Sequence, residues 1–262
     1  MEQITFDFTI FSIAGLVVFA AYFSGGLIDS VCGGGGLITV PVLMTLGMPA
    51  HMTVGTNQVS LIPGCATALF KYTKSGNIDW KVSFIALPFS LIGAFIGARL
   101  NILISEKYLQ IILLVLLPVM AVFSVIKKDV GEKDLSHTVS NHGRIIGAAA
   151  IGLSVSAYHA FYGPASGMFY MIAFAVFLRM NLLKGNGISR FLVSVSSLIS
   201  SVTYALAGMV CWKVIPVAAL AYILGNYIGA GIALTKGSKF IRPVYYCVLL
   251  MLFVKLIFDY FG

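Results

Sequence analysis

Glycine interrupts two apolar stretches of this chain, and each interruption follows an ionisable residue. The first stretch carries four consecutive glycines at 33–36, here named the first tip, and the second carries GPASG at 163–167, the second tip. Asp29 and His159 each lie four residues before the first glycine of their tip. Ordering several glycines costs conformational entropy, so we predict a helix break at both tips. A membrane tolerates such a break only where the backbone lies within protein or beside water. The tips therefore predict a cavity.

Short helices that start after the tips would give this cavity its chemistry. The first N–H groups of a helix lack intrahelical partners and carry the positive end of its dipole, so two such ends attract an anion without a charged side chain. The substrate-binding residues predicted on this basis are Gly33, Gly34, Gly35, Gly36, Gly163, Pro164, Ser166 and Gly167. A nucleotide-binding loop is disfavoured because the glycines lack a GKS/T motif and a preceding strand.

Five further polar residues extend the predicted site. Asp29 and His159 are predicted gating or proton-coupling groups, because ionisable residues inside a membrane mark functional sites and His titrates near neutral pH. In the alternative, Asp29 caps local backbone N–H groups and His159 is a hydrogen-bonded interior residue. Asn57, Gln58 and Arg190 open the next long segment of each half and are predicted substrate ligands. In the alternative, Arg190 is a topology residue: its positive charge lies at the cytoplasmic start of a helix and sets the orientation of the chain in the membrane.

The composition places these residues in a bilayer. Hydrophobic residues make up 59% of the 262-residue chain, charged residues only 10%, and the mean hydropathy is +0.98, which excludes an ordinary soluble domain. We predict an all-α polytopic membrane protein. The net charge of +8 comes from basic residues beside apolar segments, so it predicts contact with lipid headgroups and no nucleic-acid partner. The four cysteines lack CxxC spacing, and we expect neither a metal site nor a cofactor.

Apolar windows divide the chain into ten candidate segments. They cover residues 8–30, 36–48, 54–72, 82–100, 108–126, 145–162, 167–178, 190–209, 214–234 and 242–261. The second and seventh are too short to cross a bilayer. Most Lys and Arg residues fall in four clusters, at 71–81, 127–144, 179–190 and 236–242, and placing all four in the cytoplasm puts both termini outside. Residues 8–50 and 145–179 then form hairpins that either cross twice or dip to mid-membrane.

The two halves of the sequence repeat one pattern. Gly93 and Gly97 reappear as Gly225 and Gly229, 132 positions later (position 225 against position 93), and their GxxxG spacing predicts close helix packing. Five segments per copy is an odd number, so we predict that the second copy is inverted and that the substrate site lies where the interrupted segments meet. The predicted units are an N-terminal repeat at 1–126, a cytoplasmic linker at 127–144 and an inverted C-terminal repeat at 145–262.

Four motifs together resemble the sulfite exporter TauE/SafE family, also called TSUP, and its YfcA-like branch. They are GLIDSVCGGGGLITVPVLMTLGM at 26–48, VGTNQ at 54–58, FYGPASGMFY at 161–170 and KGSKFIRP at 236–243. The resemblance covers nearly the whole chain and implies transport of sulfite, a sulfonate or another organic anion across the bacterial cytoplasmic (inner) membrane. This chain departs from related sequences at two positions, because they usually have Asp in place of His159 and Lys in place of Gln58.

These observations predict a secondary transporter, not an enzyme, that exports a small anion by alternating access as its halves rock around the tips. The membrane potential favours outward movement of an anion by about 2.3 kcal/mol per charge at 100 mV, whereas uptake needs a co-transported proton or cation. A membrane scaffold or accessory subunit without transport is one alternative. An intramembrane enzyme is another, although GxSG and HExxH motifs are absent from the sequence. The sequence leaves the oligomeric state open.

Overall fold

The described part of the chain is built from helices packed side by side. The computed structural model describes residues 13–105, 108 and 131–237. In chain order these form α1 (Ile13–Cys32), α2 (Gly36–Thr45), α3 (Ala50–Lys74), α4 (Trp80–Leu103), the 3-10 helix η1 (Ser136–Thr138), α6 (Asn141–Phe161), α7 (Ser166–Phe177), α8 (Leu182–Leu206) and α9 (Ile215–Lys236). No strand occurs in these residues, which confirms the all-α prediction for them. The predicted segments at 108–126 (Tyr108 apart) and 242–261 lie outside the described residues.

Helix length separates spanning from non-spanning elements. Among the described residues, five helices, α1, α4, α6, α8 and α9, are long and apolar enough to cross a bilayer. The 25-residue α3 matches α8 in length but falls outside this group, and it buries polar side chains such as Asn57 and Gln58. At 1.5 Å per residue the 10 and 12 residues of α2 and α7 reach about 15 and 18 Å, roughly half the hydrocarbon core. These two segments are too short to cross, as predicted.

Four long helices begin earlier than their apolar windows predict, and α3 and α8 are the two that carry predicted site residues. α3 begins at Ala50 rather than residue 54, and α8 begins at Leu182 rather than residue 190. The side chain of Asn181 accepts a hydrogen bond from the backbone N–H of Lys184 at 2.8 Å, which satisfies a first-turn donor of α8. Hydropathy missed the first turns because several of their residues are polar or glycine and yet are buried by neighbouring helices.

The earlier starts change the place of three predicted site residues. Asn57, Gln58 and Arg190 each lie about two turns inside their helix. The prediction that they open α3 and α8 is therefore wrong. All three are buried, and Arg190 is 0% exposed, so its guanidinium lies in the protein interior rather than at a helix start.

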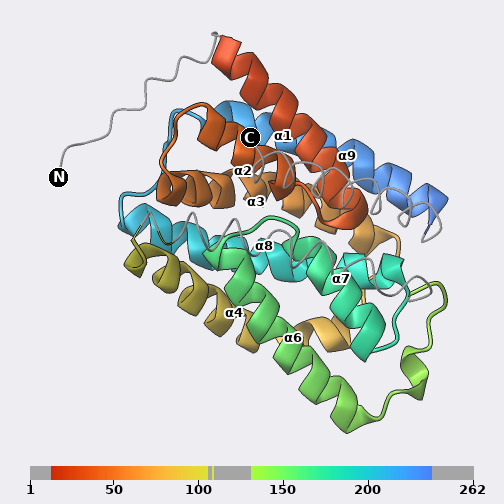
Figure 1. The fold of residues 1–262 in the computed structure, drawn as a ribbon. Helices are drawn as coiled ribbons and strands as arrows, with labels where there is room; N and C mark the ends of the chain where they lie inside the picture. The colour runs from red at the N-terminus through yellow and green to blue at the C-terminus, as the bar shows by residue number, and fades with distance from the viewer. Residues whose placement is uncertain (1–12, 106–107, 109–130, 238–262) are drawn as a thin grey trace, which may run out of the picture.

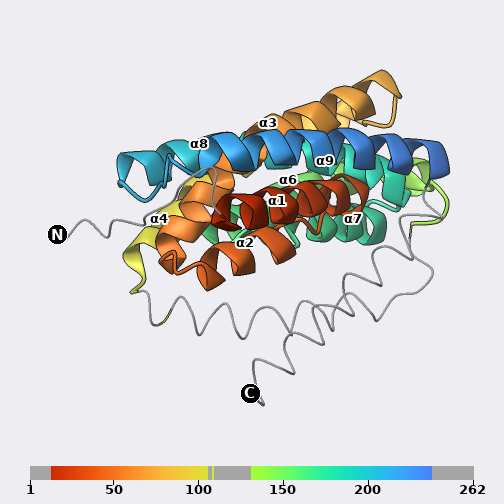
Figure 2. The same cartoon turned by 90° about the horizontal axis from the view of Figure 1, so that it is seen from above.

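The long helices form three layers (Figure 1). α1 and α9 run along one side, α4 and α6 run along the opposite side, and α3 and α8 lie between them. Seen from above, α1 again lies alongside α9 (Figure 2). Each outer pair therefore combines one helix from the first half of the sequence with one from the second half.

Glycine sets the close packing of the pair α4–α6. A Cβ at Gly93 would meet the carbonyl oxygen of Leu153, and a Cβ at Gly97 would meet the carbonyl oxygen of Ala157. Both contacts are too short for any side chain, so only glycine lets the two backbones approach this closely. The GxxxG prediction of close helix packing is confirmed for α4.

The pair α1–α9 repeats the same contact. A Cβ at Gly225 would meet the carbonyl oxygen of Phe23, and a Cβ at Gly229 would meet Ser30 and the carbonyl oxygen of Leu27. The helices of the two halves also recur in order and length, with 20, 10, 25 and 24 residues for α1 to α4 and 21, 12, 25 and 22 residues for α6 to α9. A duplicated unit accounts for both observations, and the inversion of the second copy stays a prediction.

The described part of the predicted linker forms ion pairs with both halves. Asp134 pairs with Lys184 at 2.6 Å, and Arg144 at the start of α6 pairs with Asp79 at the start of α4 at 2.7 Å. Partial burial opposes ionisation of Asp134, but hydrogen bonds from Lys184 and Ser136 outweigh it and lower the pKa of this carboxyl. Basic residues of two clusters, Arg144 and Lys184, thus take part in these contacts, and the cytoplasmic placement of the four clusters stays a prediction. The unit boundaries at 127–144 stay a prediction.

Two glycines of α9 provide a matched test of the packing. Gly229→Ala should lower the free energy of unfolding by about 1–3 kcal/mol, because the added methyl group must push α9 away from the α1 backbone. Gly231→Ala should leave stability equal or slightly higher, since its Cβ would meet only the flexible end of Lys71. The melting temperatures of the purified variants in detergent measure the difference. Equal melting temperatures would contradict the role assigned to Gly229.

Candidate anion site at the two helix tips

The two tips touch each other through their backbones. The backbone N–H of Met168 donates to the carbonyl oxygen of Gly33 at 3.3 Å. A Cβ at Gly167 would lie 2.6 Å from the Cα of Gly33, and a Cβ at Gly36 would lie 2.9 Å from the Cα of Pro164. Side chains at these glycines would force the tips apart. α2 starts at Gly36 and α7 at Ser166, close to the predicted positions after the breaks.

Left-handed backbone explains the breaks themselves. Gly33 has φ of +82° and Gly163 has φ of +102°, a region that side chains with a Cβ rarely adopt. Gly33 follows the last residue of α1, and Gly163 lies two residues after the end of α6. The predicted interruptions of the helices at residues 33 and 163 are therefore confirmed.

Protein atoms fill the space that tip side chains would need. A Cβ at Gly35 would meet the carbonyl oxygen of Gly25, the Cβ of Asp29 and the hydroxyl of Tyr222, and a Cβ at Gly167 would meet Nη2 of Arg190. All residues of both tips are buried. In this conformation the glycines make room for backbone and for Arg190, whereas the sequence predicted that they border a cavity.

Arg190 brings a buried positive charge to the tips. Its Nη1 donates to Oδ2 of Asp29, forming an ion pair between α8 and α1. Its Nη2 donates to Oγ of Ser189 at 3.2 Å. Its Nε is buried and has no hydrogen-bond partner among the described residues. A guanidinium can donate five hydrogen bonds, so this one retains donors for another acceptor.

Asp29 is bound by side chains from other helices. Besides Arg190, Sγ of Cys65 on α3 lies 3.9 Å from Oδ2 of Asp29. Tyr222 on α9 places its hydroxyl beside the same carboxylate. The carboxylate is thus held by tertiary contacts, and the alternative in which it caps local backbone N–H groups is not what the structure shows.

His159 belongs to a closed network of neutral groups. Nδ1 of His159 lies 2.6 Å from Oγ of Ser166, and Nε2 lies 2.9 Å from Oγ of Ser197. Ser197 donates to Oε1 of Gln58 at 3.1 Å, and Nε2 of Gln58 donates to the carbonyl oxygen of His159 at 2.6 Å. We assign the tautomer from this network: Nε2–H donates to Ser197, and Nδ1 accepts from Ser166. Neutral His159 then has a partner on each ring nitrogen.

Asn57 holds the first tip from the other side. Its Oδ1 accepts hydrogen bonds from Tyr22 on α1 at 3.1 Å and from Thr39 on α2 at 2.8 Å. Asn57 therefore connects three helices around the first tip. The predicted site residues thus form one buried cluster in which Asn57 acts as a brace between helices, while Arg190 has unused donors.

The sequence repeat relates the charged pair to the neutral network. Asp29 contacts Arg190 of the other half and Cys65 of its own half. His159 contacts Gln58 of the other half and Ser197 of its own half. Arg190 follows Gln58 by 132 positions, and Ser197 follows Cys65 by the same number (position 197 against position 65). The two arrangements are equivalent in position and differ in charge.

Sequence reasoning missed Cys65 and Ser197. Each lies seven residues after a predicted site residue, Gln58 and Arg190 respectively, and seven residues are two helical turns on the same face. That spacing, combined with the repeat, was the signal that could have found them. Their small polar side chains reach Asp29 and His159 only because the tips lie against this face of α3 and α8.

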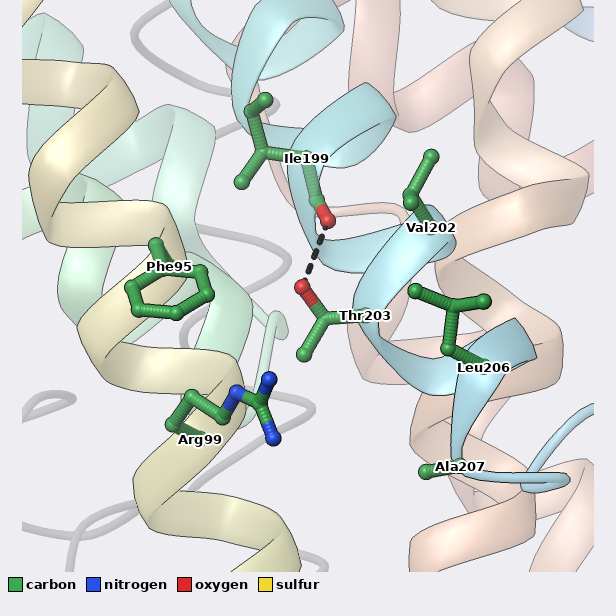
Figure 3. Close-up of a pocket in the computed structure, with 7 residues that line it drawn as sticks. All are labelled: Phe95, Arg99, Ile199, Val202, Thr203, Leu206 and Ala207. Atoms are coloured by element: carbon green, nitrogen blue, oxygen red, sulfur yellow. Dashed lines mark hydrogen bonds between the residues drawn. The ribbon is translucent and has the colours of Figure 1, made fainter.

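A separate groove lies between α4 and α8 (Figure 3). It has a volume of about 450 Å³ and is lined by Phe95, Arg99, Ile199, Val202, Thr203, Leu206 and Ala207. The side chain of Arg99 lies over the ring of Phe95 at 5.3 Å from its centroid. None of these residues belongs to the tips. Most of its apolar side chains are exposed, as expected of a surface that faces lipid.

Comparison with known proteins identifies the family. Residues 18–256 match the family described as sulfite exporter TauE/SafE. The chain belongs to this family. Together with the five candidate spans, membership of the TauE/SafE family makes the chain a multi-pass membrane protein.

Relatives match this TauE/SafE protein along almost its whole length. It is 30% identical to "Probable membrane transporter protein ORF9" of Sinorhizobium sp, with 92% of both chains covered. It is 29% identical to "Probable membrane transporter protein YfcA" of Escherichia coli strain K12, covering 95% of this chain and 91% of the relative. A "Probable membrane transporter protein" of Haemophilus influenzae is 27% identical, with 93% and 94% covered. No solved structure matches the chain.

The buried ion pair should show strong coupling in stability. Asp29→Leu leaves the guanidinium of Arg190 buried without its carboxylate, which should cost about 3–5 kcal/mol. Adding Arg190→Met to this variant should recover most of the loss, because two apolar side chains need no charge partner. Thermal unfolding of the two single variants and the double variant in detergent measures the coupling. A double variant no more stable than Asp29→Leu would show that the pair is not a unit.

Proposed function

We propose that this protein is a secondary transporter that exports a small sulfur-containing or organic anion, such as sulfite or a sulfonate, across the bacterial inner membrane. The observation that carries the proposal is the guanidinium of Arg190, fully buried beside both tips with Nε unpartnered among the described residues. Burying a cation with unused donors is costly, and a bound anion would remove that cost.

The geometry around Arg190 suits a small oxyanion. Planar guanidinium donors match the oxygen atoms of sulfonate, sulfite or carboxylate groups. The starts of α2 and α7 lie at the same place and add the positive ends of two helix dipoles. Asp29 occupies one edge of the guanidinium in this conformation. A substrate would therefore take over the contact of Asp29 or share Arg190 with it.

Tight packing across the halves suggests which parts move. Rocking of the first half against the second would break the glycine contacts of α4 with α6 and of α9 with α1. We propose instead that the pairs α1–α9 and α4–α6 move as units around α3 and α8, and that the touching tips part to admit the anion. Alternating access around an interrupted-helix site then follows the general scheme of inverted-repeat transporters.

Three further features belong to this proposal. The Lys and Arg residues of the four basic clusters support a cytoplasmic location for the connectors that carry them and termini outside. The names of the relatives are those of membrane transporters, which favours transport over an enzymatic role. A scaffold or accessory subunit, the remaining alternative, would show no solute flux when this chain alone is placed in liposomes.

Replacement of Arg190 tests the anion site. Arg190→Gln should reduce the flux of sulfite and small sulfonates into proteoliposomes at least tenfold, because the amide offers fewer donors and no charge. Arg99→Gln makes the same substitution in the groove outside the tips and should transport like the original protein. Flux is measured with labelled anions.

Arg190→Lys is the control that separates loss of the anion site from misfolding as the cause of reduced flux. It keeps the charge beside Asp29, so it should fold, yet it loses the planar donors and should still transport more slowly. Size-exclusion profiles check folding. Unchanged transport by folded Arg190→Gln would refute the site.

A further inference from the structure

The tips hold a balanced pair of charges. Among the described residues, Asp29 and Arg190 are the buried carboxylate and the buried cation, and they contact each other. The ionisable groups whose charges or hydrogen bonds act on Asp29 are Cys32 on α1, Cys65 and Tyr72 on α3, His159 on α6, Arg190 on α8 and Tyr222 on α9. Thiols and phenols are ordinarily neutral at pH 7. The local charge is therefore zero when Asp29 is ionised and His159 is neutral.

The equivalent position in the other half adds no charge. There, His159 and Gln58 replace the carboxylate and the guanidinium, and their hydrogen bonds are satisfied by Ser166, Ser197 and the His159 carbonyl oxygen. Neutral His159 needs no counter-ion in this network. The two halves of the site are thus unequal, and the whole site has one positive group with which to bind an anion.

Charge balance then couples the anion to a proton. Adding a monovalent anion while Asp29 stays ionised would leave one uncompensated negative charge among buried groups, which is strongly unfavourable. If Asp29 first takes a proton from water on the loading side, Arg190 is freed and the bound anion restores neutrality. The carboxylic acid keeps Cys65 and Tyr222 beside it as hydrogen-bonding neighbours. Release of the anion and of the proton on the other side restores the pair seen here.

We infer that this site carries one monovalent anion together with one proton on Asp29, in an electroneutral cycle that excludes dianions such as sulfate and takes sulfite as its monoanion, hydrogen sulfite. The inference rests on the proposed transport function and defines its substrate class and its coupling. It also changes the driving force. The membrane potential, which would favour export of an anion alone, no longer acts, and the direction of net movement follows the sum of the substrate and proton gradients.

Proteoliposomes containing the purified chain test the coupling with methanesulfonate, a permanent monoanion, and sulfate as the dianion. An inward methanesulfonate gradient should acidify the lumen, reported by an internal pH dye, with one proton per anion. An imposed potential of 100 mV should leave the final accumulation ratio unchanged, whereas movement of the anion alone would shift it about 50-fold. Sulfate flux should stay at the level of protein-free liposomes.

Asp29→Asn isolates the proton step. The amide is permanently neutral, so exchange of internal for external methanesulfonate should persist and lose its dependence on pH. In the original protein, exchange should fall as the pH rises, because fewer sites carry the proton. Asp79→Asn, which removes a carboxylate outside the tips, should keep the original pH dependence.

The outcomes separate the two proposals. Absence of flux for every anion, with folded protein in the liposomes, would refute the proposed function itself. Methanesulfonate flux that follows the potential and leaves the luminal pH unchanged would refute only the proton coupling. Sulfate transport as fast as methanesulfonate transport would refute the restriction to monoanions, and pH-dependent exchange by Asp29→Asn would refute Asp29 as the proton site.

Discussion

A buried guanidinium that must be neutralised is the constraint on which the rest of this structure depends. Arg190 lies two turns inside α8, wholly covered by protein, and its charge is balanced by Asp29 on α1. Because α1 leads directly into the first tip and the guanidinium lies against the second, one ion pair connects both tips to the central helices. Breaking it leaves an uncompensated charge in an apolar interior, so the pair fixes the contact between the two halves.

Two different requirements for glycine act in the fold. In the pairs α4–α6 and α1–α9, glycine removes side chains so that helix backbones touch, which holds the outer pairs together. At Gly33 and Gly163, glycine permits left-handed backbone and lets one tip lie on the other. The first use joins helices along their length, whereas the second joins two helix ends. This difference gives the transport proposal its moving and fixed parts.

The two halves of the repeat place their site residues at equivalent positions but differ in the chemistry of those residues. Asp29 and His159 occupy equivalent places, and each receives one partner from α3 and one from α8. One place holds full charges, and the other holds a network of neutral donors and acceptors. Gln58 donates directly to the backbone carbonyl oxygen of His159, and Ser197 bridges the side chains of the two residues. A duplicated scaffold can thus retain two equivalent positions while only one of them holds full charges.

The sequence by itself determined the membrane setting, the helical class, the two breaks, the short helices after them and the close packing at GxxxG. Each of these predictions follows from local properties of the sequence, because hydropathy, the entropy of glycine and the spacing of small residues depend on neighbouring residues. Only the tertiary structure decided that Arg190 is buried against Asp29 and that Gln58 forms a hydrogen bond with His159. It also decided that α3 begins at Ala50 and α8 at Leu182. These features depend on which distant side chains meet, and a polar residue in a sequence does not reveal whether water or another helix will satisfy it.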